Sequence, residues 1–247
     1  MIASLPMYDT ATTRAANDRL WSAIRNRLVK GPTELDRETD AHAQWENPDL
    51  LLSQTCSLPY RTDLKGKVQL VGTPDYGVDG CPAGYYRSCI VVHRDDPRRD
   101  LELFQGAQLA RNDVRSQSGW AALEQELGKR GLDFSFKRNV LDTGAHAASA
   151  KAVARREADL AALDAVTWTL LRRDDPSLTQ ALRVLTTTEP TPGLPLITSL
   201  SENPDEVFRA VQKAINDLTP IDRETLLLKG LTRIPEAGYV TGYTVPA

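Results

Sequence analysis

Residues 109–120 read LARNDVRSQSGW and join a short apolar run to a segment with two serines. The apolar part predicts a strand, and the periodicity of 116–130 predicts a helix. A serine at a helix start is typical of an N-cap, which contributes about 1 kcal/mol to helix stability. The same start can hold an oxyanion, because backbone N–H groups and the hydroxyls of Ser116 and Ser118 can point at one anion. Gly119 would then let the ligand approach the backbone, and both interpretations stay open here.

Two more predicted strands are followed by polar residues. The segment 143–149, TGAHAAS, is a second helix start with a glycine, and it contains His146. An isolated histidine is more often structural than a ligand, but two such starts strengthen the hypothesis of an anion site. Asp164 follows the apolar run 160–163, where it is either an N-cap or a carboxylate for a ligand amine. Because the carboxyl ends of parallel strands meet at one edge, we expect these groups to line one crevice.

Short apolar runs alternate with helical patterns along the rest of the chain. This alternation is typical of an α/β fold with mostly parallel sheets. Neither an internal repeat nor a Gly/Ser-rich linker divides the sequence, so two domains would have to be interleaved. We expect strands over 2–8, 49–55, 68–73, 85–93, 109–112, 134–141, 159–163, 182–188 and 194–198, and helices over 14–29, 116–130, 146–157, 164–171, 204–218 and 222–229.

The composition excludes several classes of protein. Of the 247 residues, 41% are hydrophobic and 26% charged, and the net charge of -3 offers no basic field for nucleic acid. No apolar run approaches the roughly 20 residues of a membrane helix, so we expect no membrane insertion. The N-terminus lacks the pattern of a signal peptide. We therefore expect a cytoplasmic protein as the sequence is written, or a periplasmic one if a signal peptide was removed.

The sequence contains none of the common cofactor or catalytic motifs. A P-loop, a dinucleotide-binding glycine fingerprint, a nucleophile elbow and a His-Glu-x-x-His motif do not occur. The three histidines lie far apart, and the three cysteines form no Cys-x-x-Cys pair. We therefore expect no metal and no cofactor, and thiols rather than a disulfide between Cys56 and Cys81.

In their order along the chain, these segments resemble the phosphate- and phosphonate-binding group of periplasmic-binding-protein-like proteins, the solute-binding components of ABC importers. The resemblance covers roughly residues 2–200 and rests on 4–8 (SLPMY), 49–59 (DLLLSQTCSLP), 85–93, 112–120, 143–149 and 158–164 (ADLAALD). It implies two interleaved α/β lobes of type 2 topology with a ligand cleft. Lobe 1 would comprise 1–88 and 184–247, and lobe 2 would comprise 89–183, with 85–93 and 182–188 crossing between them as a hinge.

The resemblance also implies which residues bind the ligand. The helix start with Ser116 and Ser118 would hold the phosphonate oxygens, and His146 would meet the same oxyanion. Gln117 departs from the family, which has a small hydroxyl residue there. The full set implied or predicted is Tyr8 and Thr55 from the first lobe, and Ser116, Ser118, Gly119, His146 and Asp164 from the second, with Asp164 meeting an amine.

These expectations combine into one functional hypothesis and one alternative. The hypothesis is a monomeric solute-binding protein, not an enzyme, that captures a small anion or zwitterion such as phosphate or a phosphonate for an ABC permease. The alternative is a cytoplasmic enzyme or ligand sensor on the same scaffold, because one fold hosts many functions. Cys56, at the end of a predicted strand, is the only candidate nucleophile, and it is more simply a structural thiol.

Overall fold

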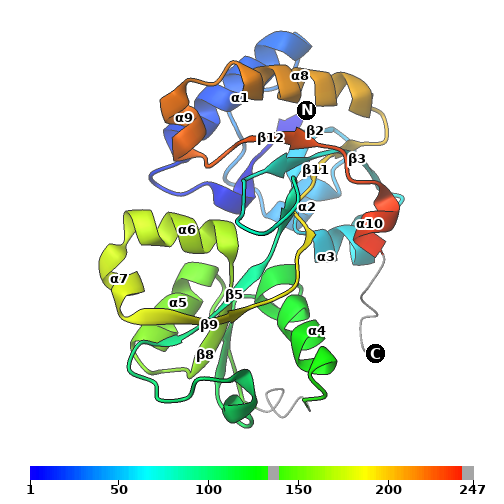
Figure 1. Cartoon of the computed structure of the whole chain (residues 1–247). Coiled ribbons are helices and arrows are strands. Elements are labelled where there is room, and N and C mark those ends of the chain that lie inside the picture. The colour runs from blue at the N-terminus through cyan, green and yellow to red at the C-terminus, as the bar shows by residue number, and fades with distance from the viewer. Residues whose placement is uncertain (133–138, 241–247) are drawn as a thin grey trace. The chain divides into compact units, whose positions relative to one another are not determined.

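The computed structural model describes residues 1–132 and 139–240, which form two compact units. Unit 1 comprises residues 1–85 and 192–240, and unit 2 comprises residues 86–191 within the described part. Over the described residues, the chain therefore passes from unit 1 to unit 2 once and returns once (Figure 1). The lobe boundaries predicted after residues 88 and 183 stay predictions.

Unit 1 is built on a mixed five-stranded sheet with the order β1-β2-β11-β3-β12. Its β1 and β2 pair in parallel, whereas β11 is antiparallel to both β2 and β3, and β12 is antiparallel to β3. The prediction of mostly parallel sheets is therefore wrong for unit 1, because the strands that follow the return of the chain run in the opposite direction. The bounds are β1 (Ile2–Ala3), β2 (Leu50–Gln54), β3 (Val68–Asp75), β11 (Leu196–Ser199) and β12 (Gly230–Thr232).

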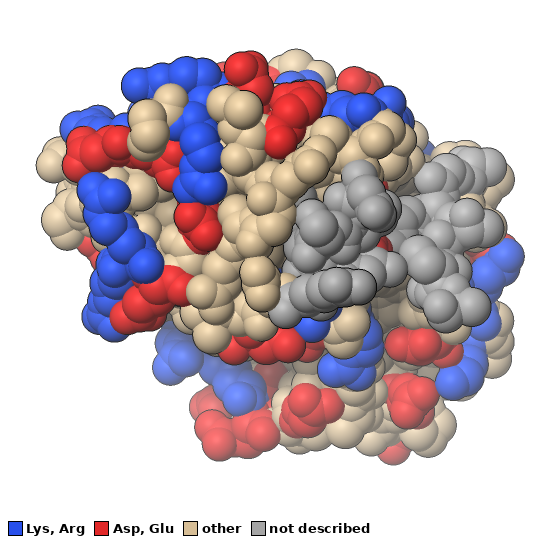
Figure 2. Space-filling view, turned by 90° about the horizontal axis from the view of Figure 1, so that it is seen from below, with Lys and Arg blue, Asp and Glu red and all other residues tan. Residues whose placement is uncertain are grey.

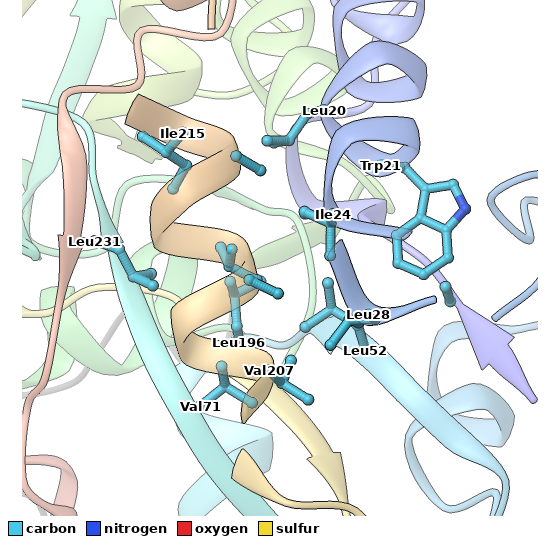
Figure 3. Packing of buried hydrophobic residues seen from close by; sticks show 14 of the residues in the cluster. Leu20, Trp21, Ile24, Leu28, Leu52, Val71, Leu196, Val207, Ile215 and Leu231 are labelled. Carbon is cyan, nitrogen blue, oxygen red and sulfur yellow. The ribbon is translucent and has the colours of Figure 1, made fainter. Parts of the chain in front are cut away.

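Two amphipathic helices, α1 (Arg14–Leu28) and α8 (Pro204–Asn216), pack against each other over this sheet. Their apolar side chains meet those of the strands in one core, in which Ile24 and Val207 are almost fully buried (Figure 3). Helix α1 ends at Leu28, and Val29 follows it with a left-handed φ of 55°. Gly31 has a φ of 109°, and a Cβ there would lie 2.7 Å from Leu51, so this position requires glycine.

Unit 2 is built on a second mixed sheet with the order β7-β6-β8-β5-β9. Strand β6 pairs in parallel with β7 and β8, whereas β5 is antiparallel to β8 and β9, so this sheet is not mostly parallel either. The three parallel strands therefore end at the same edge of the sheet. The bounds are β5 (Ser88–His93), β6 (Leu109–Arg111), β7 (Val140–Asp142), β8 (Leu160–Asp164) and β9 (Leu182–Thr187).

Each parallel strand of unit 2 leads into a helical segment. After β6 the chain enters a π-helical turn, η4 (Gln117–Ala121), which continues as α4 (Ala122–Lys129). Strand β7 leads to α5 (His146–Ala154), and β8 leads directly to α6 (Ala165–Asp174). The core beneath includes Ile90, Leu123 and Leu160, which are at most 1% exposed. Unit 2 thus has a hydrophobic core of its own.

Several predicted elements need correction. The strand expected over 2–8 ends at Ala3, and Pro6–Tyr8 forms a 3₁₀ turn, η1, because Pro6 lacks the N–H that a ladder needs. Most of the strand expected over 134–141 lies outside the described residues, and β7 begins at Val140. The remaining described helices and strands are short: α2 (Ala41–Trp45), α3 (Ser57–Pro59), η2 (Tyr60–Leu64), β4 (Tyr85–Tyr86), η3 (Leu101–Phe104), α7 (Pro176–Gln180), β10 (Thr191–Pro192), α9 (Pro220–Thr225) and α10 (Glu236–Val240).

Charged side chains of both signs are interspersed on the face shown in Figure 2. Basic and acidic groups alternate on the described part of this face instead of forming one field of a single sign. This agrees with the near balance of 30 basic and 33 acidic residues in the sequence. Within residues 1–132 and 139–240, no helix has the length and apolar character needed to cross a bilayer.

Candidate functional site

One edge of the unit 2 sheet gathers the polar groups that the sequence singled out. The parallel strands β6, β7 and β8 all end there, and the helical segments η4, α5 and α6 begin there. Backbone N–H groups at helix starts have no partner within the helix and carry the positive end of the helix dipole. The edge therefore brings the backbone N–H groups and the polar side chains of three helix starts together.

Ser116 is the N-cap of η4. Its hydroxyl accepts a hydrogen bond from the Gly119 N–H at 3.0 Å, and its carbonyl accepts one from the Ala121 N–H at 3.1 Å. The second bond closes a π-type turn, a form that recurs at functional sites. The capping interpretation of Ser116 is therefore correct, while its contact with a ligand stays a prediction.

Ser118 and His146 come together across the two helix starts. The Ser118 hydroxyl lies 3.0 Å from His146 Nε2, within hydrogen-bonding distance. The Ser118 backbone carbonyl accepts a hydrogen bond from the Ser88 hydroxyl at 2.8 Å. Ser88 lies on the antiparallel strand β5 and is 1% exposed, so no local pattern in the sequence could reveal this support.

The His146 ring is buried although the residue as a whole is partly exposed at the start of α5. Its Nδ1 atom has no solvent access. This burial lowers the pKa of His146 from 6.5 to about 4, and the backbone of Ala162 opposes the shift only in part. The imidazole is therefore neutral at neutral pH, and it offers hydrogen bonding rather than a positive charge.

Gly119 is required by close packing. A Cβ at this position would lie 1.6 Å from Asn112 Oδ1 and 3.1 Å from the Ser116 hydroxyl. The space that a side chain at position 119 would need is thus occupied by Asn112, which was not among the predicted site residues. Protein atoms therefore fill this side of Gly119, which leaves no room for a ligand there. The contact of Gly119 with a ligand stays a prediction.

Asp164 is the N-cap of α6. Its Oδ1 accepts hydrogen bonds from the N–H groups of Val166 and Thr167 at 2.7 and 3.0 Å, and the residue is 2% exposed. Of the two interpretations of Asp164, the N-cap is therefore the one that the structure shows. The role of Asp164 toward a ligand amine stays a prediction.

The other two predicted residues, Tyr8 and Thr55, lie in unit 1 just after the parallel strands β1 and β2. The Tyr8 ring packs edge-on against Tyr76, with 4.9 Å between the ring centroids. The Tyr76 hydroxyl in turn accepts a hydrogen bond from Gln54 Nε2 at 3.2 Å. Thr55 is fully buried, and its hydroxyl donates to the Cys56 carbonyl at 3.2 Å. Contact of either residue with a ligand stays a prediction.

The described residues offer neither a metal cluster nor a disulfide bond. No group of three or more His, Cys, Asp or Glu side chains is placed to hold a metal ion within those residues. Cys56, Cys81 and Cys89 form no disulfide bond with one another in the structure, and Cys89 is buried whereas Cys56 and Cys81 are half-buried. The preference for thiols over a disulfide between Cys56 and Cys81 stays a prediction.

A family model described as the periplasmic substrate-binding protein of the phosphonate ABC transporter matches residues 49–240, which is most of the chain. The chain belongs to this family. The match confirms the family to which the sequence motifs pointed. No protein of curated function matches the sequence.

Solved structures share the fold at low sequence identity. PhnD1 from Prochlorococcus marinus, in complex with methylphosphonate, is 14% identical with a TM-score of 0.71 over 96% of this chain and 94% of its own. A binding component of an ABC phosphonate transporter from Pseudomonas aeruginosa is 14% identical with a TM-score of 0.71, over 97% and 83%. A Xanthomonas citri protein bound to ATP is 16% identical with a TM-score of 0.70, over 96% and 92%. These likenesses confirm the α/β, type 2 periplasmic-binding-protein-like fold.

Proposed function

We propose that the helix starts of unit 2 hold the oxyanion of a phosphonate, with Ser118 and His146 as its central contacts and Ser116 beside them. The observation that carries the proposal is the 3.0 Å approach of Ser118 Oγ to His146 Nε2 at the edge where three parallel strands end. The family match and the methylphosphonate held by PhnD1 from Prochlorococcus marinus support a phosphonate as the anion.

The chemistry of this edge suits an oxyanion. Hydroxyl and imidazole groups can donate hydrogen bonds to phosphonate oxygens, and the starts of η4 and α5 add backbone donors and a favourable dipole. Hydrogen bonds to a charged group contribute about 1.5–3 kcal/mol each, so a few of them suffice for tight binding. Both Ser118 and Ser116 are buried, which strengthens such bonds by excluding water.

The test is titration calorimetry with methylphosphonate on the wild type and on Ser118→Ala. We expect Ser118→Ala to weaken binding roughly 10- to 100-fold, the loss of one hydrogen bond to a charged group. Ser177→Ala is the matched control, because Ser177 in α7 donates its hydroxyl only to nearby Asp175, at 2.8 Å. Equal affinities for the wild type and Ser118→Ala would place the anion elsewhere.

The remaining predicted contacts are proposed with separate tests. Tyr8→Phe and Thr55→Ala remove one hydroxyl each from unit 1, and Asp164→Asn removes a charge while keeping an N-cap. If Asp164 binds an ammonium group, Asp164→Asn weakens an aminophosphonate but not methylphosphonate. Equal losses for the two ligands would leave Asp164 with its capping role alone.

We also propose that the protein delivers its ligand unchanged to an ABC permease from the periplasm, as the family description implies. Cys56, the candidate nucleophile of the sequence analysis, occupies the N-cap position of the three-residue helix α3, and its side chain makes no capping hydrogen bond there. Phosphorus NMR of methylphosphonate incubated with the protein should show one unchanged signal. Turnover that disappears in Cys56→Ser would favour the enzyme alternative.

A further inference from the structure

Arg111 lies between the two helix starts that carry Ser118 and His146. It is the last residue of β6 and stands opposite Asp142, the last residue of β7. The guanidinium donates two hydrogen bonds to the Asp142 carboxylate, from Nε at 2.8 Å and from Nη2 at 3.0 Å. This pairing lowers the pKa of Asp142 and keeps its carboxylate charged.

The same guanidinium also covers the ring of Trp120, with its central carbon 4.6 Å from the ring centroid. Trp120 belongs to the π-helical turn η4, which also contains Ser118. A planar, delocalised cation can grip a carboxylate with two donors and stack on an aromatic ring at once, whereas an ammonium cannot. Arg111 thus joins η4 to the end of β7.

The backbone of Arg111 holds the loop that leads to His146. Its carbonyl accepts hydrogen bonds from the Thr143 N–H at 2.8 Å and the Thr143 hydroxyl at 3.1 Å. The Thr143 hydroxyl also lies 2.7 Å from the hydroxyl of Ser149, which is buried in the second turn of α5. Side chain and backbone of one residue therefore fix both segments of the candidate site.

We propose that Arg111 is a positioning residue that holds Ser118 and His146 at the spacing required for anion binding. This proposal rests on the proposed function. It assigns Arg111 no contact with the ligand, because its side chain is engaged by Asp142 and Trp120. Binding gains affinity when the contacting groups are held in place before the ligand arrives.

The contribution of Arg111 to folding stability is expected to be small. The Arg111 side chain is 13% exposed and that of Asp142 is 62% exposed, so water reaches the carboxylate and screens the ion pair, and Arg111→Lys keeps the positive charge opposite it. Trp120 remains packed in the unit 2 core through the rest of its contacts. A substitution of Arg111 should therefore loosen the site without unfolding the unit.

The test compares Arg111→Lys with the wild type by methylphosphonate titration and by NMR titration of the His146 ring without ligand. We expect affinity to fall about tenfold, the loss expected when a preorganised site becomes mobile, while the melting temperature stays within about 3 °C. We also expect the pKa of His146 to rise from about 4 toward 6.5, because a loosened loop admits water to the ring. His146→Gln assigns the ring signal.

Arg130→Lys is the matched control. Arg130, next to the end of α4, pairs with Glu126 at 2.8 Å and with Glu102 at 3.2 Å, so its substitution changes a similar ion pair. It should leave both affinity and the His146 titration unchanged. If Arg111→Lys fails to fold, Asp142→Asn removes the carboxylate partner and is expected to have the same two effects.

The two readouts separate the possible failures. If the wild type binds no methylphosphonate, the proposed function is wrong, and the ligand-free His146 titration still tests the positioning role. If the wild type binds and Arg111→Lys matches it in affinity and in His146 titration, the positioning role is wrong. Equal effects of Arg111→Lys and Arg130→Lys would also overturn it.

Discussion

At the scale of single residues, His146 shows how burial sets the chemistry of the candidate site. Its ring contacts Ser118 but has no carboxylate partner among its described hydrogen bonds, so desolvation dominates its pKa. A neutral imidazole next to an anion avoids the cost of a buried cation when the site is empty. It can still supply a hydrogen bond once the anion is bound.

This burial predicts a pH-dependent stability. Because the pKa of His146 is about 4 in the folded protein and near 6.5 when unfolded, only the unfolded chain takes up a proton between these values. The stabilisation is fully present above about pH 6.5 and is lost as pH falls toward 4, at roughly 1.4 kcal/mol per pH unit. Denaturant unfolding between pH 7 and 4.5 should therefore show a smaller loss for His146→Gln than for the wild type.

His42→Gln serves as the control for this measurement, because His42 lies in the short helix α2 of unit 1. The carboxylates titrate equally in all three proteins, so the difference between curves isolates His146. Parallel pH profiles for the wild type and His146→Gln would mean that the ring is accessible in the folded protein.

At the scale of elements, the question is whether the start of η4 can hold both its N-cap, Ser116, and a bound anion. Ser116 caps η4 through one hydroxyl lone pair, while a phosphonate would need the same helix start for its negative charge. Asparagine and aspartate cap as well as serine does, but only aspartate adds a negative charge. Substituting Ser116 by asparagine or by aspartate therefore keeps the cap in both variants and adds a negative charge in only one, which distinguishes capping from anion binding.

We expect Ser116→Asn to keep the melting temperature, because asparagine caps as well as serine does, and to weaken methylphosphonate binding less than Ser116→Asp does. Ser116→Asp should keep or raise the melting temperature, since a carboxylate stabilises a helix start by about 0.3–1 kcal/mol, and should weaken binding at least tenfold by repelling the anion. Ser116→Ala should cost about 1 kcal/mol of unfolding free energy. Thermal melts and calorimetry measure both quantities. Methylphosphonate binding by Ser116→Asp at wild-type affinity would exclude the anion from this helix start.

Many of the helices and helix caps could be predicted from the sequence. Periodicity predicted α1 and α8, and local capping chemistry gave capping as one of two interpretations of Ser116 and Asp164, which the structure shows as caps. Strand directions could not be predicted, because β5 and β9 pair with partners distant in sequence. For the same reason the sequence did not predict the hydrogen bond from Ser88 to the Ser118 carbonyl. It also did not predict that the Arg111 side chain contacts both Asp142 and the Trp120 ring.

At the scale of the whole molecule, the two units have separate cores and are joined where the chain passes between residues 85 and 86 and between 191 and 192. Both passages lie in extended backbone, in the short strands β4 and β10. A few residues at the ends of extended elements can absorb the dihedral changes of a hinge. The hinge expected from the sequence, near 85–93 and 182–188, thus stays a testable prediction.

We expect saturating methylphosphonate to lower the radius of gyration of the wild type in small-angle scattering, because a ligand shifts a two-state equilibrium toward the state that binds it better. Ser118→Ala at the same ligand concentration is the control, since its weaker binding should leave the radius closer to that of the free protein. The shift should follow the calorimetric binding curve, which separates it from an effect of ionic strength. A constant radius across that curve would mean that the anion binds without any movement of the two units.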